Sequence, residues 1–405
     1  MESQFIQGNA LFTDINTVPI QYPYLVDNIN TEVIIVGGGV TGAICSYYLS
    51  KNNISAVILE KGRIAHGSTS ITTSLLQYEL DKSFGKLSKI LSPKDIVKAY
   101  KLGVKALDEL HKFIDEQGNR CDYEKRNTLL YTDKKLDTKE IEEEFKFRQD
   151  NNFNVKLIKE ENNPYSFPLK AGILCENAGA ELDPYKYTHQ LLDVSTKLGL
   201  RVYENTEVVK VNYLQDFVEV ETLYGKKVRG KKIVVATGYN TSLFTDRNFA
   251  TKSTSFNIAT KPVKNFEGWK DRSLIRDNGD PYTYIRTTKD GRIIIGGEDV
   301  QFIPDINNEK LAEEKYSILE QKLKFMFKEI DNIEIEYRYC GCFASTTDNL
   351  GFIGPDPVHK NLWYCLGYGA NGILFAILGG MMLSKLYKGE HCEDMKLFKV
   401  DRFDN

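Results

Sequence analysis

Apolar residues near the N-terminus follow the pattern of a parallel strand, a tight turn and a helix. The run Val33–Val36 is uniformly apolar, as in a strand buried on both faces. The run stops at Gly37, and apolar positions then recur at helical spacing from Ile44. A second apolar run, Ala56–Leu59, has the length of another buried strand. The pattern therefore predicts a strand–turn–helix–strand unit at the start of a parallel sheet.

The rest of the chain alternates between helical and extended patterns. Residues 93–150 are highly charged, with apolar positions at helical spacing, and predict surface helices. Further helices are expected at 187–198, 309–327 and 374–386. Short extended runs predict a meander of strands at 201–203, 207–213, 217–222 and 226–229, followed by an apolar strand that begins at 232. Residues 250–335 are rich in further strand patterns.

The turn after the first strand carries glycines with a specific spacing. Gly37, Gly39 and Gly42 form G-x-G-x-x-G, which serves a tight turn, the close approach of a pyrophosphate, and helix–strand packing. Val40 and Thr41 would lie at the helix N-terminus, where free N–H groups favour phosphate. The alternative is a glycine turn that binds nothing. The strand–helix context favours a dinucleotide site.

Further residues suit the same ligand. Glu60, at the end of the second strand, is placed to accept hydrogen bonds from a ribose. The hydroxyl-rich loop that follows could close over the pyrophosphate, although it could also be a solvated loop. A strand ending in Ala236, Thr237 and Gly238 brings backbone close to a ligand again. A glycine turn opens the last helix, which suits an electron-rich group or helix packing alone.

Composition limits the classes of partner. The chain has 405 residues, enough for two domains, and its 53 basic and 56 acidic residues give a net charge of −3. Without a basic field, neither nucleic acid nor an anionic membrane is an expected partner. We expect no transmembrane segment, no signal peptide and a cytoplasmic location, which also suits seven scattered cysteines. The pair Cys340 and Cys342 lacks a second Cys/His pair, so no metal site is expected.

Taken in order, these segments resemble the D-amino-acid oxidase-like family of FAD-dependent amine oxidoreductases, which includes glycine oxidase, sarcosine oxidase and γ-glutamylputrescine oxidase. The matching segments lie at 36–42, at Glu60 and Lys61, and at 67–70, 183–184, 236–238, 295–297, 347–354 and 367–373. The resemblance implies an α/β fold: a Rossmann-type FAD-binding domain built from three chain segments, and an inserted α+β substrate domain with a large mixed sheet. The FAD-binding domain would comprise residues 1–85, 170–245 and 336–405. The substrate domain would comprise residues 86–169 and 246–335.

The resemblance also assigns roles to residues. FAD would be bound non-covalently, with Val208 beside the adenine, and Ser68, Thr69, Thr72 and Thr73 at the pyrophosphate and ring edge. Gly341 and the turn Gly367–Ile373 would hold the isoalloxazine; the turn contains Gly367, Tyr368, Gly369, Ala370, Asn371, Gly372 and Ile373. We place Tyr282, Tyr284, Arg286 and Asn371 at the catalytic end. Strand alternation would put 282, 284 and 286 on one face, either towards the flavin or towards solvent.

Two departures from the family pattern bear on the substrate. Amino-acid oxidases carry an arginine that clamps the substrate carboxylate, and the corresponding stretch here, 341–344, holds Phe343 instead. A larger amine or modified polyamine is therefore favoured over a simple α-amino acid, unless Arg286 takes over. Sarcosine oxidases attach FAD through a cysteine that Cys340 and Cys342 flank without matching.

Two hypotheses about function follow. In the first, the protein oxidises a C–N bond of an amine or amino-acid derivative: hydride passes to flavin N5 and the imine is hydrolysed. In the second, it binds flavin without amine turnover, as a sensor or electron-transfer subunit. A disulfide reductase is set aside because it needs a C-x-x-C or C-x₄-C pair and a second glycine motif. The amine, the electron acceptor (oxygen or a redox carrier) and any role of Gln77 or Glu79 stay open.

Overall fold

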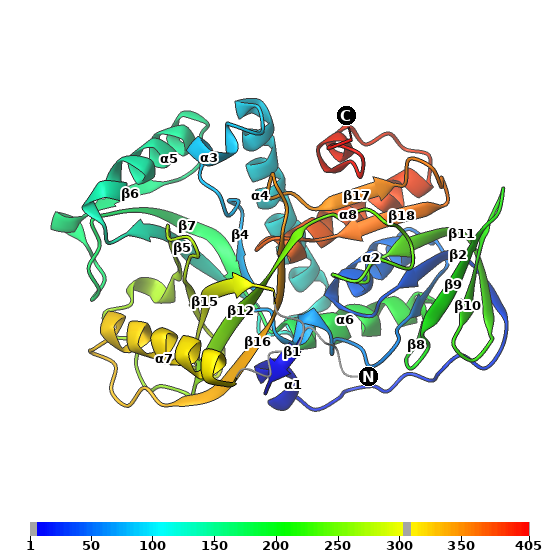
Figure 1. The fold of residues 1–405 in the computed structure, drawn as a ribbon, viewed down its shortest axis with the longest axis horizontal. Helices are drawn as coiled ribbons and strands as arrows, with labels where there is room; N and C mark the ends of the chain where they lie inside the picture. The colour runs from blue at the N-terminus through cyan, green and yellow to red at the C-terminus, as the bar shows by residue number, and fades with distance from the viewer. Residues whose placement is uncertain (1–5, 303–308, 405) are drawn as a thin grey trace.

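Two β-sheets organise the molecule. The computed structural model describes residues 6–302 and 309–404. These residues form one sheet of ten strands and one of eight, and Figure 1 shows the two sheets side by side with helices packed around them. The α/β architecture expected from the sequence is confirmed.

The eight-stranded sheet is built on parallel strands. Its main order is β17-β18-β11-β2-β3-β8, and the contacts from β18 to β8 are all parallel. β10 and β9 extend it as an antiparallel meander from β11. The strands are β2 (Ile29–Val36), β3 (Ala56–Leu59), β8 (Arg201–Tyr203), β9 (Val208–Tyr213), β10 (Val218–Thr222), β11 (Lys227–Val235), β17 (Phe352–Pro355) and β18 (Leu362–Leu366).

Alternate residues of β2 enter two different cores. Val33 and Ile35 pack with the helices on one face, and Ile34 and Val36 pack with the meander on the other. Because both faces are covered, the strand is apolar throughout, as its sequence pattern predicts. The helices of this half are α2 (Val40–Lys51), α4 (Pro93–Gln117), α6 (Pro184–Lys197) and α8 (Gly372–Tyr387).

The ten-stranded sheet is mixed. Its main order is β1-β16-β12-β15-β14-β13-β5-β7-β4, with β6 paired to β7, and β13 and β5 are its parallel pair. The strands are β1 (Ile6–Gly8), β4 (Leu75–Gln77), β5 (Glu124–Thr132), β6 (Lys156–Lys159), β7 (Ala171–Glu181), β12 (Thr251–Thr260), β13 (Leu274–Asp277), β14 (Tyr284–Thr287), β15 (Ile293–Gln301) and β16 (Ile335–Ser345). α7 (Glu309–Met326) covers its outer face, and α1 (Leu11–Asp14), α3 (Phe84–Leu87) and α5 (Thr138–Asp150) are the remaining α-helices of the described chain.

One expectation about the chain's organisation differs from the structure, and the division into two domains stays a prediction. The stretch 93–150, expected to be helical, contains β5 between α4 and α5, because its charged first half hides a strand whose second half is buried. The predicted domain boundaries do not coincide with the division between the sheets. β1, β4, β7 and most of β16 lie within the ranges expected for the FAD-binding domain, yet they belong to the ten-stranded sheet. A short strand's sequence does not reveal which sheet supplies its hydrogen-bonding partner.

Across residues 6–302 and 309–404, none of the helices has the combination of length and apolar character needed to cross a bilayer. The same part of the chain holds no group of three or more His, Cys, Asp or Glu side chains suited to a metal ion.

Candidate active site

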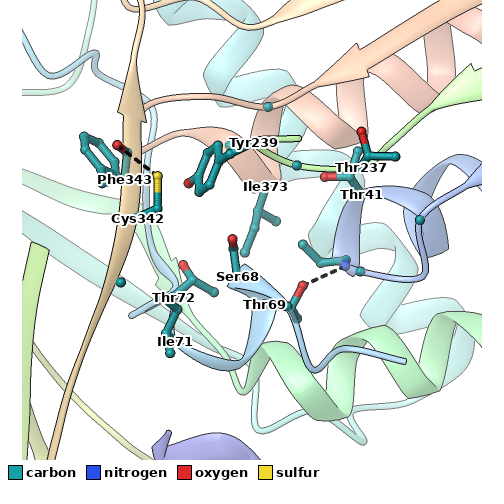
Figure 2. Close-up of a pocket in the computed structure, with 18 of the residues that line it drawn as sticks. Thr41, Ser68, Thr69, Ile71, Thr72, Thr237, Tyr239, Cys342, Phe343 and Ile373 are labelled. Atoms are coloured by element: carbon teal, nitrogen blue, oxygen red, sulfur yellow. Dashed lines mark hydrogen bonds between the residues drawn. The ribbon is translucent and has the colours of Figure 1, made fainter. Parts of the chain in front are cut away.

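A cavity of about 490 Å³ lies between the two sheets (Figure 2). It is within the range of small-molecule and cofactor sites. One wall comes from the turn before α2, the end of β3 and the end of β11 in the eight-stranded sheet. The other comes from β12, β14, β15 and β16 in the ten-stranded sheet. Figure 2 shows the loop carrying Ser68, Thr69 and Thr72 between these walls.

The glycines of the turn before α2 are required for different physical reasons. Gly37 has a φ of +111°, and a Cβ there would lie 2.4 Å from the carbonyl oxygen of Ala236. A Cβ on Gly42 would lie 2.0 Å from the carbonyl oxygen of Gly37, so this position serves helix–strand packing and does not line the cavity. Gly39, Val40 and Thr41 do line it, at the N-terminus of α2, where the N-cap residue Gly39 has no side chain to cap the helix. Backbone N–H groups are therefore directed at the cavity.

Glu60 lines the cavity and accepts a hydrogen bond from the glycine turn. Its Oε2 accepts a hydrogen bond from the N–H of Gly38 at 2.7 Å, and its Oε1 accepts one from Gly62 at 2.8 Å. Burial raises the pKa of this carboxyl, and the two backbone donors oppose the rise. Lys61 and Val208 also line the cavity, as do Arg63 and Glu207, which the sequence did not single out.

The hydroxyl-rich loop lies against the start of α2. Ser68, Thr69, Thr72 and Thr73 all line the cavity. The Oγ1 of Thr69 accepts a hydrogen bond from the N–H of Val40 at 3.0 Å, as the dashed line in Figure 2 marks. The loop therefore lies against the glycine turn, and its contact with a pyrophosphate stays a prediction.

The glycine turn before α8 lines the opposite side. Gly341, Ala236, Thr237 and Gly238 line the cavity together with Gly367, Gly369, Ala370, Gly372 and Ile373. Two predicted residues do not line it. Tyr368 donates its hydroxyl to the carbonyl of Gly238 at 3.0 Å, and Asn371 donates its amide to the carbonyl of Glu79 at 2.8 Å. Both side chains hold neighbouring backbone, so Asn371 is not at the catalytic end.

Tyr284, the first residue of β14, and Tyr282, in the loop before it, line the cavity. Their ring centroids are 5.8 Å apart. The hydroxyl of Tyr284 donates to Asn257 Oδ1 at 3.1 Å and lies 3.1 Å from Ser255 Oγ. Its ring occupies the space above Gly296, where an added Cβ would come within 2.4 Å of a ring carbon. Gln77 lines the cavity as well, and Glu79 does not.

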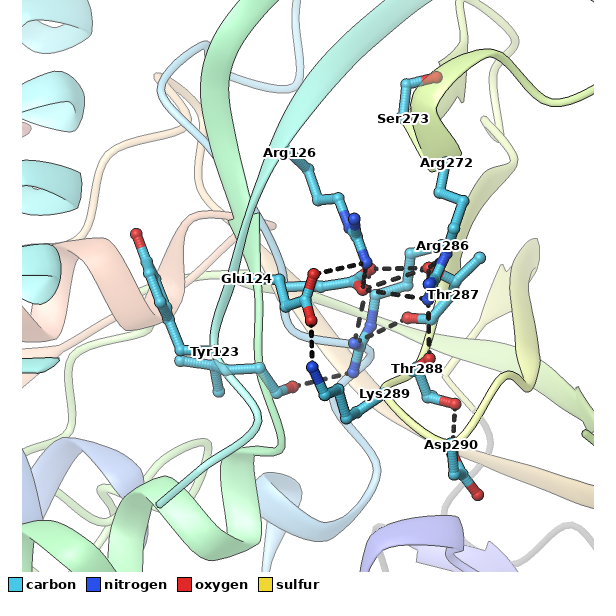
Figure 3. A network of polar contacts seen from close by, with 12 residues as sticks. Tyr123, Glu124, Arg126, Arg272, Ser273, Arg286, Thr287, Thr288, Lys289 and Asp290 are labelled. Atoms are coloured by element: carbon cyan, nitrogen blue, oxygen red, sulfur yellow. Dashed lines mark hydrogen bonds and ion pairs between the residues drawn. The ribbon is translucent and has the colours of Figure 1, made fainter. Parts of the chain in front are cut away.

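Arg286 is not in the cavity, which corrects the expectation that it faces the substrate. It is 2% exposed and donates to the backbone carbonyls of Thr73, Leu182 and Thr287. Figure 3 shows it inside a polar network with Arg126 and Arg272. Alternation along β14 does put it on the same face as Tyr284, but it lies further along the strand, where the chain at 73 and 182 covers it.

Several cavity residues had no clear signal in the sequence. Arg276, Ser255, Asn257 and Asp299 line the end of the cavity that Tyr282 and Tyr284 form, beside Cys342 and Phe343, which the sequence analysis had already singled out. Arg276 is 4% exposed and donates to the carbonyls of Asp81 and Leu80, at 2.8 and 3.3 Å. The signal in the sequence was a charged residue within the apolar strand β13. A charge buried in such a strand needs polar partners, which marks the position as special. Burial raises the pKa of the Cys342 thiol to about 11.

Comparison with known proteins gives one family. The family model described as "FAD dependent oxidoreductase" matches residues 32–386. Glycine oxidase of Bacillus subtilis is 23% identical over 92% of this chain and 97% of its own. Gamma-glutamylputrescine oxidoreductase of Escherichia coli is 23% identical over 90% of this chain and 85% of its own. Among solved structures, glycine oxidase from Geobacillus kaustophilus has the same fold, with a TM-score of 0.79 at 18% identity, covering 92% of this chain and 99% of its own.

Proposed function

This chain belongs to the FAD-dependent oxidoreductase family, and we propose that it oxidises the C–N bond of an amine or amino-acid derivative. The protein is an FAD-dependent enzyme by that membership. Relatives along nearly the whole chain are named for amino substrates, which supports the proposed reaction class. The observation that carries the proposal is the polar and aromatic wall of Tyr282, Tyr284 and Asn257, which lines the same cavity as the glycine turn of α2.

The cavity residues fit FAD. A cofactor that runs between the sheets needs open space beside the backbone. Gly67 and Gly238 leave such space, because a Cβ added to either residue would meet nothing within 4 Å. In our proposal the N-terminus of α2, Ser68 and Thr69 hold the pyrophosphate, and Glu60 holds the adenosine ribose. The turn Gly367–Ile373 then holds the isoalloxazine. When bound, FAD supplies the two-electron acceptor for the hydrogen removed from the carbon that bears nitrogen.

The chain's own residues would orient the amine and exclude water. Tyr284 has a fixed ring, because Gly296 leaves space for it and its hydroxyl lies between Asn257 and Ser255. A fixed aromatic wall would align the carbon–hydrogen bond. No further acid–base pair is needed once the nitrogen is neutral, because its lone pair is then free for imine formation. Burial raises the pKa of Tyr284, so its hydroxyl stays protonated and serves as a hydrogen-bond donor. The product imine is then hydrolysed by water.

The visible spectrum tests this function. The purified protein is loaded with FAD and titrated anaerobically with amino acids, N-methyl amines and polyamine derivatives. We expect one class to bleach the flavin bands, and dithionite added afterwards shows how much flavin can be reduced at all. Flavin that dithionite bleaches and no amine bleaches would overturn amine oxidation and favour a binding role without turnover.

The Tyr284 wall has its own control. Tyr284→Phe removes a hydroxyl from the cavity, while Tyr316→Phe removes one from a buried ring of α7, outside the cavity. We expect only the first change to slow flavin reduction by the identified amine, by about tenfold, the size of one lost polar contact in a buried site. Equal effects of the two changes would remove Tyr284 from the reaction.

A further inference from the structure

We propose that Asp299 binds the ammonium group of the substrate and accepts the proton that this group must lose before oxidation, so that the enzyme selects a cationic primary or secondary amine without requiring a carboxylate. This inference rests on the proposed amine oxidation, and it names the group that recognises the amine. It comes from the backbone of β15, the contacts of the Asp299 carboxylate and the charges around it.

A β-bulge turns Asp299 into the cavity. On β15, Ile293 and Ile295 pack under α7 on the outer face, whereas Ile294 enters the core on the inner face. Simple alternation would therefore direct Asp299 outwards. The pairing with β12 slips between Thr254 and Phe256, so that Glu298 and Asp299 both lie opposite Ser255.

The extra residue inverts the alternation of the strand. Glu298 has a φ of +55° and its carboxylate lies 3.1 Å from Lys315 on α7, on the outer face. Asp299 lines the cavity on the other side. Bulges are frequent beside active sites because they redirect one side chain in this way.

The Asp299 carboxylate has an unused acceptor. Its Oδ2 accepts a hydrogen bond from Ser253 Oγ at 3.3 Å. Its Oδ1 is buried and has no donor among the described residues. A buried carboxylate with one oxygen unpaired is costly, and a charge-assisted hydrogen bond from an ammonium would offset that cost. Burial also raises the pKa of this carboxyl, and the hydroxyls of Ser255 and Ser253 oppose the rise.

The competing cation in the cavity already has partners. Arg276 donates to two backbone carbonyls and lies 3.9 Å from the Asp81 carboxylate, which offsets its charge. Phe343, which lines this end of the cavity, carries no charge. At this end of the cavity, among the described residues that line it, Asp299 is thus the charge that no neighbouring ion pair balances.

Three compounds of one shape test the proposal without turnover. tert-Butylammonium, tert-butanol and pivalate differ in charge, and none has a hydrogen on its central carbon that could be oxidised. Each is titrated into the FAD-loaded protein at pH 8 and constant ionic strength, and binding is measured from the shift of the flavin bands. We expect tert-butylammonium to bind at least tenfold more tightly than pivalate.

Two variants test whether Asp299 is the cause of the preference for tert-butylammonium. Asp299→Asn keeps the shape and removes the charge, and we expect it to weaken tert-butylammonium at least tenfold while pivalate binds as well as before or better. Glu298→Gln is the matched control, because it makes the same change one residue away on the outer face. A wild-type preference for pivalate, or equal ammonium binding by Asp299→Asn, would overturn the inference. Since no probe is oxidised, these results are independent of whether any amine reduces the flavin.

Discussion

The hydroxyl oxygen of Thr69 accepts a hydrogen bond from the backbone N–H of Val40 at 3.0 Å. Val40 is the first residue of α2, and Thr69 belongs to a loop that follows the second strand of the sheet. This contact fixes the loop over the helix N-terminus, where both line the cavity. The end of the fold that we propose binds the pyrophosphate is thereby built from two chain segments rather than from the glycine motif alone.

Replacing Thr69 by valine tests this contact. The change keeps the side-chain shape and removes the acceptor, so we expect the Kd of FAD to rise about fivefold to tenfold, the effect of one hydrogen bond worth about 1 kcal/mol. Reconstitution of the apoprotein measures the Kd. Ser70→Ala is the control: Ser70 bonds to the carbonyl of Gly67 in the same loop but does not line the cavity. If both variants bind FAD alike, the Val40 contact has no part in holding it.

Substitutions at two glycines of the motif should affect different properties, FAD binding for one and stability for the other. At Gly39 the neighbour of an added Cβ is the Thr69 hydroxyl oxygen, at 3.1 Å, and the branched side chain of valine would occupy the cavity. We expect Gly39→Val to fold but lose FAD, with a Kd raised about 100-fold or more, because it takes the pyrophosphate's space. Absorbance at the flavin bands measures the FAD content. A Gly39→Val protein that is purified yellow and fully loaded would refute this placement of the cofactor.

At Gly42 the added atom meets backbone instead. A Cβ there would lie 2.0 Å from the carbonyl oxygen of Gly37, which cannot move without distorting the turn. We expect Gly42→Ala to destabilise the apoprotein itself by about 2 kcal/mol or more, in the range of overpacked cores. Urea denaturation without FAD measures it. An apoprotein of unchanged stability would contradict the tight helix–strand contact.

Arg286 should act on stability rather than on substrate. It lies 4.0 Å from the buried Glu181 carboxylate and satisfies three backbone carbonyls. We expect Arg286→Met to lower the free energy of unfolding by about 3 kcal/mol, because it leaves a buried carboxylate and several acceptors less well paired. Arg272→Met, near the same carboxylate but 28% exposed, should cost about 1 kcal/mol or less. A stable Arg286→Met protein with a raised KM would instead return Arg286 to the site.

Because His189 is buried, we expect the folded protein to lose stability as the pH decreases. It is 5% exposed, neither ring nitrogen has a hydrogen-bond partner among the described residues, and burial lowers its pKa to about 4. Between that value and the unfolded value of about 6.5, the unfolded chain binds the proton more readily, so stability falls as the pH decreases. The free energy of unfolding therefore decreases by about 2 kcal/mol between pH 7.5 and pH 5.

His189→Gln should remove this component. The free energy of unfolding, measured in urea at pH 7.5 and pH 5 for both proteins, should decrease about 2 kcal/mol less in the variant than in the unmodified chain. Identical pH dependence in the two proteins would mean that His189 is not buried in its neutral form.

Local patterns in the sequence were enough for the cofactor half of the molecule. The apolar runs of β2 and β3, the glycine spacing and the acid at Glu60 depend on residues within one strand–turn–helix unit, and the structure has them at the same positions. The hydroxyl loop and the turn before α8 were also identified from short segments. Backbone geometry of this kind is determined by nearby residues, because a positive φ or a close approach allows little besides glycine.

The substrate half depended on contacts between distant segments. Alternation put Arg286 and Tyr284 on one face, but it could not show that the chain at 73 and 182 would cover the arginine. Asp299 was missed because a bulge against β12 inverts the alternation of β15. Strand period is a local property, whereas register, bulges and the cover of a sheet are determined by the partner strand and by segments far along the chain. The sequence by itself therefore determined the strand–turn–helix framework around the glycine motif, and only the tertiary structure decided which charged side chains line the cavity.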